Sequence, residues 1–245
     1  MTRIRLIGTG NILSASNNAS VLMDDALLID CGNGVVKAML KQGIDLGRIE
    51  ALLVTHLHGD HFSDVLELIM CRAFAGVDRK LDIYGPEGLE EAVYELCRIC
   101  FADICDEFSN LVDRAKVNFK SFDELEDIKG YDVEAYKMLH NGMSAYGYLI
   151  KKDGLAVAVS GDTGRCDNLD AMIERCDVAI LEMTGIEENE SHLCVNDIKY
   201  YEDRYKKDII VTHMSDKAKE MANTMEHRFL VPEDGSTYEY KKGRL

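Results

Sequence analysis

The sequence predicts an α/β protein in which two β-sheets lie between layers of helices. Three observations support this fold class. Short apolar segments typical of buried strands recur along the chain, segments with one apolar helical face alternate with them, and tight-turn signals join some strands as hairpins. Two sheets packed face to face beneath helices would bury all these strands. The 245 residues contain no Pro/Ser-rich linker, so we expect a single domain over residues 1–245.

The first half of the chain begins with strand signals and then alternates. Arg3–Ile7 alternates polar and apolar residues, and Asp24-Asp25 separates two apolar runs as in a hairpin. An apolar stripe at helical spacing follows the first buried strand. The expected strands are Arg3–Ile7, Val21–Met23, Ala26–Ile29, Ala51–Val54 and Leu81–Tyr84, and the expected helices are Val35–Gln42, Val65–Ala73 and Pro86–Phe108.

The second half continues the alternation, with one clear hairpin turn at Asp153-Gly154. Two of its apolar runs are followed by polar stretches that suit an active site. The expected strands are Val133–Leu139, Tyr146–Ile150, Leu155–Ser160, Val178–Leu181 and Ile209–Thr212, and the expected helices are Asp167–Arg175, Val195–Tyr205 and Asp216–Glu226.

Composition excludes some classes of partner. The chain carries 28 Lys and Arg against 44 Asp and Glu, a net charge of −16. Binding to extended nucleic acid or to an anionic membrane needs a basic surface. The charge balance therefore favours a small-molecule or nucleotide-like substrate over both of these partners, and it leaves a homodimer open.

The sequence also predicts a cytoplasmic protein. Its first residues, MTRIRLIGTG, lack the long apolar core of a secretory signal. No apolar run approaches the roughly 18–20 residues of a membrane-spanning helix. In the cytoplasm the eight cysteines are expected to be reduced thiols.

Three of these cysteines, Cys97, Cys100 and Cys105, form a C-x2-C-x4-C pattern in a segment expected to be helical. One interpretation is a second metal site, and the other is a set of thiols packed on one helix face. No partner Cys or His pair with zinc-site spacing follows, so we favour packing.

The segment VTHLHGDHFSD holds three of the seven histidines of the chain. On an extended chain, His56 and His58 point to the same side, because side-chain direction repeats every two residues. Gly59 permits a tight turn, after which Asp60 and His61 enter the next helix. Imidazole and carboxylate groups suit zinc, manganese or iron. The sequence therefore predicts a metal site here rather than a merely polar loop.

Further candidate ligands follow other apolar runs. His140, Asp162 and His213 each come soon after a segment that is expected to be a buried strand. Five of the seven histidines therefore stand at strand ends. A site for two metal ions needs more ligands than the histidine segment supplies, and we expect these three residues to complete it.

Together these motifs resemble the metallo-β-lactamase-fold hydrolases, and most closely their ribonuclease Z-like branch. The matching segments are THLHGDH, SGDT and VTHMS, with LIDCGNG ahead of the first motif and VPEDGSTYEY near the C-terminus. The resemblance covers nearly the whole chain. It implies a four-layer αββα sandwich with a two-metal site on one edge.

The resemblance also implies that the seven ligands divide into two sets that share one bridging carboxylate. We expect two divalent transition-metal ions, zinc before manganese or iron. The first set is His56, His58 and His140, the second is Asp60, His61 and His213, and the bridge is Asp162.

A two-metal site of this kind has a defined chemistry. Two cations about 3.5–4 Å apart can share one hydroxide and clamp a reacting phosphoryl or carbonyl oxygen. Metal binding brings the pKa of water from ~15.7 to near 7, so the expected nucleophile is a metal-bound hydroxide. The resemblance implies that Asp60 also takes a proton from the attacking water. Asp30 resembles a carboxylate that orients a ligand imidazole, and capping of a turn is its alternative role.

His192, in ESHLCVNDI, is a sixth histidine that neither ligand set requires. In the ribonuclease Z-like branch a histidine stands about this far before the last metal ligand, and here 213 − 192 = 21 residues separate His192 from His213. The resemblance implies that it assists the leaving group or holds a phosphate, which a side chain with a pKa near neutrality can do. The alternative is an exposed histidine at the start of a helix.

The interval between His140 and Asp162 bears on the substrate. In the members of this branch that process tRNA, the resemblance implies a long Gly- and Pro-rich arm at this interval. In this chain the interval spans 162 − 140 = 22 residues, which two strands and their turn fill. The sequence therefore favours a small or nucleotide-like phosphodiester, such as a cyclic one, over tRNA.

The sequence is compatible with three functions. The first is a metal-dependent phosphodiesterase, with tRNA 3′-end processing as its large-substrate alternative. The second is a hydrolase of lactones, thioesters or carboxylic esters on the same metal ions. The third is a metal-bearing binding or redox protein, which the absence of a fused flavin domain before Leu245 disfavours. We expect the first.

Overall fold

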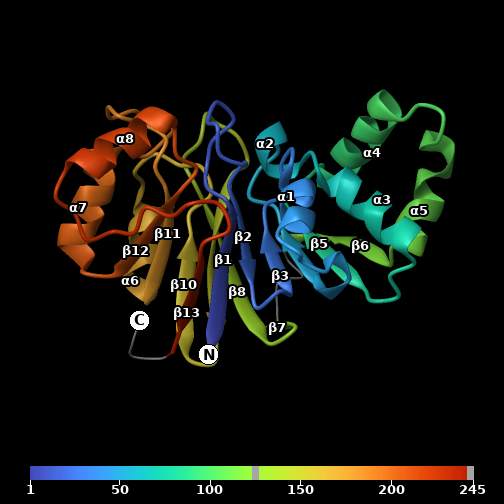
Figure 1. Ribbon diagram of the computed structural model, residues 1–245, viewed down its shortest axis with the longest axis horizontal. Helices are drawn as coiled ribbons and strands as arrows, with labels where there is room; N and C mark the ends of the chain where they lie inside the picture. The colour runs from blue at the N-terminus through green and yellow to red at the C-terminus, as the bar shows by residue number, and fades with distance from the viewer. Residues whose placement is uncertain (123–126, 242–245) are drawn as a thin grey trace.

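The computed structural model describes residues 1–122 and 127–241. Two β-sheets lie face to face, and helices cover the outer side of each (Figure 1). The predicted four-layer αββα sandwich is confirmed. Residues 123–126 and 242–245, Leu245 among them, lie outside the described part.

The first sheet has seven strands in the order β13-β1-β2-β3-β4-β5-β6. The strands from β3 to β6 run parallel to one another, and the remaining pairs are antiparallel. The strands are β1 (Thr2–Gly8), β2 (Ser20–Met23), β3 (Leu27–Ile29), β4 (Ala51–Leu53), β5 (Leu81–Tyr84), β6 (Val117–Lys120) and β13 (Thr237–Tyr240).

The second sheet has six strands in the order β12-β11-β10-β9-β8-β7. The strands β10, β11 and β12 are parallel, and β8 runs in the same direction because β8 and β10 are both antiparallel to β9. The strands are β7 (Asp127–Ile128), β8 (Tyr131–Lys137), β9 (Tyr146–Lys152), β10 (Leu155–Val159), β11 (Val178–Glu182) and β12 (Asp208–Thr212).

Helices on the outer faces complete the four layers, one group to the right and one to the left of the sheets in Figure 1. The short helix α2 lies at the upper edge of the first sheet in that view. The first group is α1 (Val35–Lys41), α3 (Val65–Ala75), α4 (Leu89–Cys100) and α5 (Phe108–Arg114), the second is α6 (Asp167–Arg175), α7 (Val195–Tyr205) and α8 (Asp216–Thr224), and shorter turns are α2 (Gly59–Phe62), η1 (Leu46–Arg48) and η2 (Cys105–Glu107). Among the described residues, no helix combines the length and the apolar character needed to cross a bilayer.

Three apolar layers hold these elements together, because alternate residues of each strand face opposite sides. In β3, Leu27 and Ile29 pack between the two sheets, whereas Leu28 packs beneath the first helix group. In β10, Val157 faces the other sheet and Ala158 packs beneath the second helix group. Burial on both faces explains why these strands read as continuous apolar runs.

Most of the expected elements are confirmed, and three of them match residue for residue: the strand Leu81–Tyr84 and the helices Asp167–Arg175 and Val195–Tyr205. Three strands were not expected, namely β6, β7 and β13. β7 has only two residues, and β13 is an edge strand with one buried residue, Tyr240, so neither carries a strong apolar pattern.

The expected helix Pro86–Phe108 is wrong in its extent. It is divided into α4, η2 and α5, and Phe101 leaves the helical conformation. The reversal brings the Phe108 ring within 4.9 Å of Tyr94. In one continuous helix these two residues would stand about 21 Å apart along the axis. Packing of two short helices against each other therefore outweighs the local helical pattern.

The same segment contains the cysteine pattern. Cys97 is buried, Cys100 is exposed and Cys105 is half-buried outside α4, so the packing interpretation holds for Cys97 alone. None of the groups of potential metal ligands found in the described part of the chain includes these thiols.

Candidate metal centre

Four strands deliver polar side chains to one edge of the sandwich. β4 leads into His56 and His58, β8 leads to His140, β10 to Asp162 and β12 to His213. Each of these residues follows the carboxyl end of its strand by one to five positions. The apolar strands fix the backbone, and the first residues beyond them are free to be polar. The predicted ligands from both sheets therefore meet at one place.

The first group of ligand atoms lies around the histidines of the β4 loop. His56 Nε2 is 3.0 Å from His58 Nδ1, and His140 Nε2 is 3.2 Å from the same Nδ1. Asp162 Oδ2 lies 3.9 Å from Nε2 of both His56 and His140. A tetrahedral zinc ion, with bonds of 2.0–2.1 Å, separates its ligands by roughly 3.3 Å. The spacing of this group therefore fits a metal ion.

The second group lies beside it. His213 Nε2 is 3.3 Å from both His61 Nε2 and Asp60 Oδ2. Asp162 Oδ1 lies 3.4 Å from His61 Nε2, whereas Asp162 Oδ2 faces the first group. One carboxylate thus presents an oxygen to each group, which is the arrangement a bridging ligand requires.

Asp30 orients the second group, as the sequence indicated. Its Oδ2 lies 2.8 Å from His61 Nδ1, which leaves Nε2 of that imidazole for the centre. The same carboxylate accepts hydrogen bonds from the Thr55 backbone N–H and hydroxyl at 2.8 and 2.9 Å. The two hydrogen bonds from Thr55 hold the Asp30 carboxylate in place. The carboxylate in turn fixes the orientation and the tautomer of the His61 imidazole.

Two further imidazoles have an oxygen against Nδ1. His140 Nδ1 donates to the Ser191 carbonyl at 2.9 Å, and His213 Nδ1 lies 2.8 Å from Thr184 Oγ1. Both contacts direct Nε2 toward the centre. The sequence did not predict roles for Thr184 and Ser191. Both look like ordinary loop residues in the sequence, and only the fold places each beside a histidine.

The charges of the centre fit a cation. Asp162 is 3% exposed, and its Oδ1 is buried without a hydrogen-bond partner. Burial, together with the charges of His61 and His140, lowers the pKa of His56 to about 2, so this imidazole is neutral. Burial raises the pKa of Asp60, but the hydrogen bond and charge of His213 outweigh it and lower the pKa to about 2. Burial lowers the pKa of His61, but the charges of Asp162 and Asp30 outweigh it and raise that pKa. A metal ion binds the ionised carboxylates and the neutral imidazoles, so it would displace the proton of His61.

His192 lies at the mouth of the centre. Its ring centroid is 4.8 Å from that of His140 and 6.0 Å from that of His213, and its side chain is 23% exposed. Its Nδ1 lies 2.8 Å from Glu182 Oε1. Burial lowers the pKa of His192, but the hydrogen bond and charge of Glu182 outweigh it, so the pKa is raised above its ordinary value.

Glu182 is the residue that the sequence interpretation missed. It ends β11, is 1% exposed, and also accepts the backbone N–H of Thr163 at 3.1 Å and of Thr184 at 2.9 Å. Its signal was a carboxylate directly after the apolar run Val178–Leu181. A buried carboxylate with three donors is rigid, and it holds His192 in one orientation.

Among the described residues, one further group of potential metal ligands includes His192. Asp162, His192 and His213 also place ligand atoms within 4.8 Å of one another. His192 Nδ1 already lies 2.8 Å from Glu182 Oε1, however, so a carboxylate occupies this nitrogen. The geometry therefore separates His192 from the seven predicted ligands.

The fold and the edge site together define a metal-dependent hydrolase of the metallo-β-lactamase fold. The chain belongs to the family described as anti-Pycsar protein Apyc1, whose sequence model matches residues 2–236. It is also similar to a ribonuclease Z from Mycobacterium bovis, with 29% identity over 194 residues that span 74% of this chain and 69% of that protein.

Solved structures show the same fold. The metallo-β-lactamase fold protein YhfI from Bacillus subtilis superposes with a TM-score of 0.77 at 19% identity, covering 98% of this chain and 100% of that one. A diphosphatase of the PhnP family superposes with a TM-score of 0.75 at 20% identity, covering 98% of both chains. These structures confirm the fold, and the ribonuclease Z relative confirms the predicted resemblance to the ribonuclease Z-like branch.

Proposed function

We propose that the chain is a two-metal phosphodiesterase that hydrolyses a small or nucleotide-like phosphodiester. The observation that carries this proposal is the pair of His192 and Glu182, whose 2.8 Å contact lies beside the seven candidate ligands and outside them. A protonated imidazole at this place suits the departure of an alkoxide, which is a poor leaving group. The similarity to a ribonuclease Z, which acts on phosphodiesters, is consistent with this chemistry.

Two divalent ions would occupy the two ligand groups, zinc before manganese or iron. His56, His58 and His140 would hold one, Asp60, His61 and His213 the other, and Asp162 would bridge them. Such ions lower the pKa of water and place positive charge against phosphate oxygens.

The side chains supply the remaining functions. Asp60 has one oxygen toward His213, and its carboxylate is placed to accept a proton from the attacking water. Burial lowers the pKa of His192, but Glu182 outweighs it, favours the protonated imidazole and fixes its ring through Nδ1. The proton on Nε2 then passes to the departing oxygen. Because the Glu182 carboxylate accepts from Thr163, Thr184 and His192, we regard it as a positioning residue.

The substrate is inferred to be small. The net charge of −16 repels a long polyanion. The interval from His140 to Asp162 consists of β9, β10 and short connections, as the sequence predicted, and contains no long arm. Both observations favour a mononucleotide-sized diester over tRNA.

The variant His192→Ala tests this proposal. The metal-loaded enzyme and the variant are compared on an alkyl and on an aryl phosphodiester, with metal content measured in both proteins. Loss of general-acid help typically costs ~10²–10⁴-fold, and we expect that loss on the alkyl diester. The aryl diester has a better leaving group and should lose much less. Metal content should stay unchanged.

Two results would contradict the proposal. An equal and small loss on both diesters would remove His192 from catalysis and favour hydrolysis of a lactone, thioester or carboxylic ester. Activity on a tRNA precursor that exceeds activity on every small diester would favour the large-substrate alternative. A parallel panel of lactones, thioesters and a tRNA precursor separates these cases.

A further inference from the structure

Thr184, two positions after β11, contacts the candidate ligand His213 at two places through one oxygen atom. Its hydroxyl donates to the His213 carbonyl at 2.9 Å, and the same Oγ1 lies 2.8 Å from His213 Nδ1. Thr184 is itself held, because its backbone N–H donates to Glu182 at 2.9 Å and its carbonyl accepts the Ser215 hydroxyl at 2.7 Å. The hydroxyl therefore stands at a fixed point behind the imidazole.

These two contacts determine which nitrogen of His213 carries a hydrogen. A hydroxyl has one hydrogen, and a carbonyl can only accept, so the hydrogen of Thr184 lies toward the His213 carbonyl. Oγ1 then meets Nδ1 as an acceptor, and Nδ1 carries the hydrogen of that contact. In the neutral imidazole, Nε2 is left with a lone pair, 3.3 Å from both Asp60 Oδ2 and His61 Nε2. Thr184 thus selects the tautomer that can bind a metal ion.

A second acceptor lies near the same hydrogen. Asp162 Oδ1 is 3.3 Å from His213 Nδ1, farther than the hydroxyl, and it makes no hydrogen bond within the described part of the chain. This oxygen also faces the second ligand group, 3.4 Å from His61 Nε2. If the Nδ1 hydrogen turned to Asp162 Oδ1, it would compete with a metal ion for that oxygen. By accepting this hydrogen, Thr184 leaves the bridging oxygen to the ion.

The backbone of His213 gives an independent reason for the contact. Its φ is +50°, a left-handed conformation that is unfavourable for a residue with a Cβ. Such a conformation persists only where its surroundings hold it. Here the Thr184 hydroxyl binds the His213 carbonyl, and the next residue, Met214, donates its backbone N–H to the Thr9 carbonyl at 2.8 Å. The hydroxyl therefore fixes the backbone of this ligand as well as its ring.

We propose that Thr184 is a positioning residue for one of the two ions, the one that Asp60, His61 and His213 would hold with Asp162. It sets the tautomer and the backbone of His213, and it keeps the Nδ1 hydrogen away from Asp162. The inference rests on the proposed two-ion centre. Because the contacts of the hydroxyl are to the second ligand group, the two ions should depend on it unequally.

Zinc binding by the full chain tests the inference. Chelator-treated protein is titrated with Zn²⁺ in a calorimeter, which gives the number of ions and the affinity of each. Thr184→Val replaces the hydroxyl with a methyl group of similar size, and Thr184→Ser keeps the hydroxyl. Thr224→Val is the matched control, at an exposed threonine of α8 whose hydroxyl donates to the Met221 carbonyl. Thermal unfolding with a chelator present shows whether each variant is folded.

Thr184→Val should weaken the binding of one ion ~10–100-fold, the usual effect of losing the group behind a ligand imidazole. The other ion should keep its wild-type affinity. Thr184→Ser should recover most of the loss, and Thr224→Val should match the wild type. At limiting zinc the Thr184→Val enzyme should hydrolyse the aryl phosphodiester more slowly, and excess zinc should restore most of that activity, because Thr184 acts through the ion.

Thr184→Ala is a second variant without the hydroxyl. A water molecule can replace the oxygen in the space that alanine leaves at this half-buried position, so its loss should lie between those of the valine and serine variants. This order keeps the test decisive if the valine variant does not fold.

Several results would overturn the inference. They are wild-type affinity for both ions in Thr184→Val, an equal loss for both ions, and a loss that Thr184→Ser does not recover. A wild-type protein that binds a single ion would contradict the two-ion centre, and Thr184 would keep its role only if that ion depends on the hydroxyl. Because zinc affinity is measured without substrate, these outcomes are independent of which substrate the enzyme hydrolyses.

Discussion

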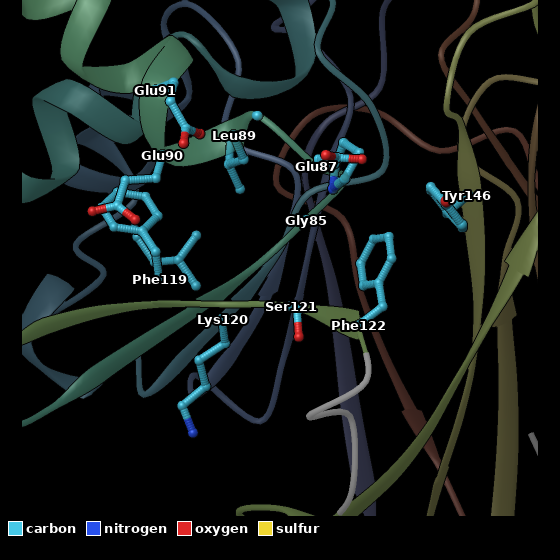
Figure 2. A pocket seen from close by; sticks show the side chains of 13 residues that line it. Gly85, Glu87, Leu89, Glu90, Glu91, Phe119, Lys120, Ser121, Phe122 and Tyr146 are labelled. Carbon is cyan, nitrogen blue, oxygen red and sulfur yellow. The ribbon is translucent and has the colours of Figure 1, made fainter.

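The metal centre and a cavity of about 530 Å³ where β5, β6 and β9 end (Figure 2) open at the same edge of the sandwich, yet they are built differently. Five of the seven candidate ligands follow strand ends, Asp60 and His61 lie in α2, and all but the half-buried His58 are buried. Oxygen contacts fix the imidazoles of His61, His140 and His213 from behind.

The cavity instead combines half-buried aromatic rings with carboxylates at its rim. The Phe122 ring lies edge-on to that of Tyr146, with centroids 4.4 Å apart, and points toward Glu87 (Figure 2). The comparison indicates that the chemistry resides in the rigid region, whose polar side chains are fixed from behind.

The largest effect is expected at the one carboxylate that both ligand groups share. Asp162→Ala removes an oxygen from each group, so bound metal should fall and kcat/KM should drop on the order of 10⁴-fold, the scale of losing a central catalytic group. Metal content by elemental analysis, together with kcat/KM on the aryl phosphodiester, measures the effect.

The matched control is Asp103→Ala, at an exposed aspartate between α4 and η2 that is not among the candidate ligands. Circular dichroism should show the same secondary structure in both variants, because Asp162 lies at the sheet edge rather than in an apolar layer. Wild-type turnover in a metal-loaded Asp162→Ala protein would exclude the bridging role.

The same comparison explains what the sequence could predict. His140, Asp162 and His213 were visible because each is a polar residue soon after an apolar run, and strand ends can be recognised locally. Phe122 follows β6 of the first sheet, and Tyr146, 24 residues later (146 − 122), begins β9 of the second. Nothing local marks them, since their contact exists only after the two sheets pack. Glu182 is an intermediate case. The sequence shows it directly after an apolar run, but does not show that His192 is its partner.

An intermediate effect is expected from Glu182→Gln. The amide keeps the shape of the side chain but loses the charge that raises the pKa of His192. Loss of a supporting contact of this kind typically costs ~10–100-fold in activity. The loss should therefore be smaller than in His192→Ala and should fall on kcat for the alkyl diester. The measurement is kcat and KM on alkyl and aryl diesters.

A double variant distinguishes positioning from a purely structural role. If Glu182 acts through His192, its substitution should add almost nothing once His192 is already alanine, so the two losses should not multiply. Losses that multiply, or an equal loss on the alkyl and aryl diesters, would show that Glu182 acts independently. Metal content should remain that of the wild type in all three proteins.

The smallest effect concerns Asp64, a buried carboxylate directly before α3. Asp64 is 5% exposed, and its Oδ2 accepts the Val36 backbone N–H at 3.0 Å. Burial raises the pKa of Asp64 to about 6, in contrast to Asp60, whose pKa the imidazoles lower. The folded state therefore favours the neutral carboxyl. Its contribution to stability is complete below the unfolded pKa near 3.8 and is lost as pH rises through about 6.

Asp64→Asn removes this titration. As pH rises from about 4.5 to about 7.5, the wild type should lose this contribution to its free energy of unfolding, whereas the variant should not. The variant should therefore become more stable relative to the wild type over this range. A pKa raised from 3.8 to about 6 limits the gain to about 3 kcal/mol. If the amide weakens the hydrogen bond from the Val36 N–H, that cost is the same at every pH. It does not change how the stability difference between the two proteins depends on pH. Urea unfolding of both proteins with a chelator present keeps metal release out of the comparison. A difference that stays flat over this pH range would show that Asp64 is ionised in the folded state, and that its surroundings resemble those of the metal-binding carboxylates.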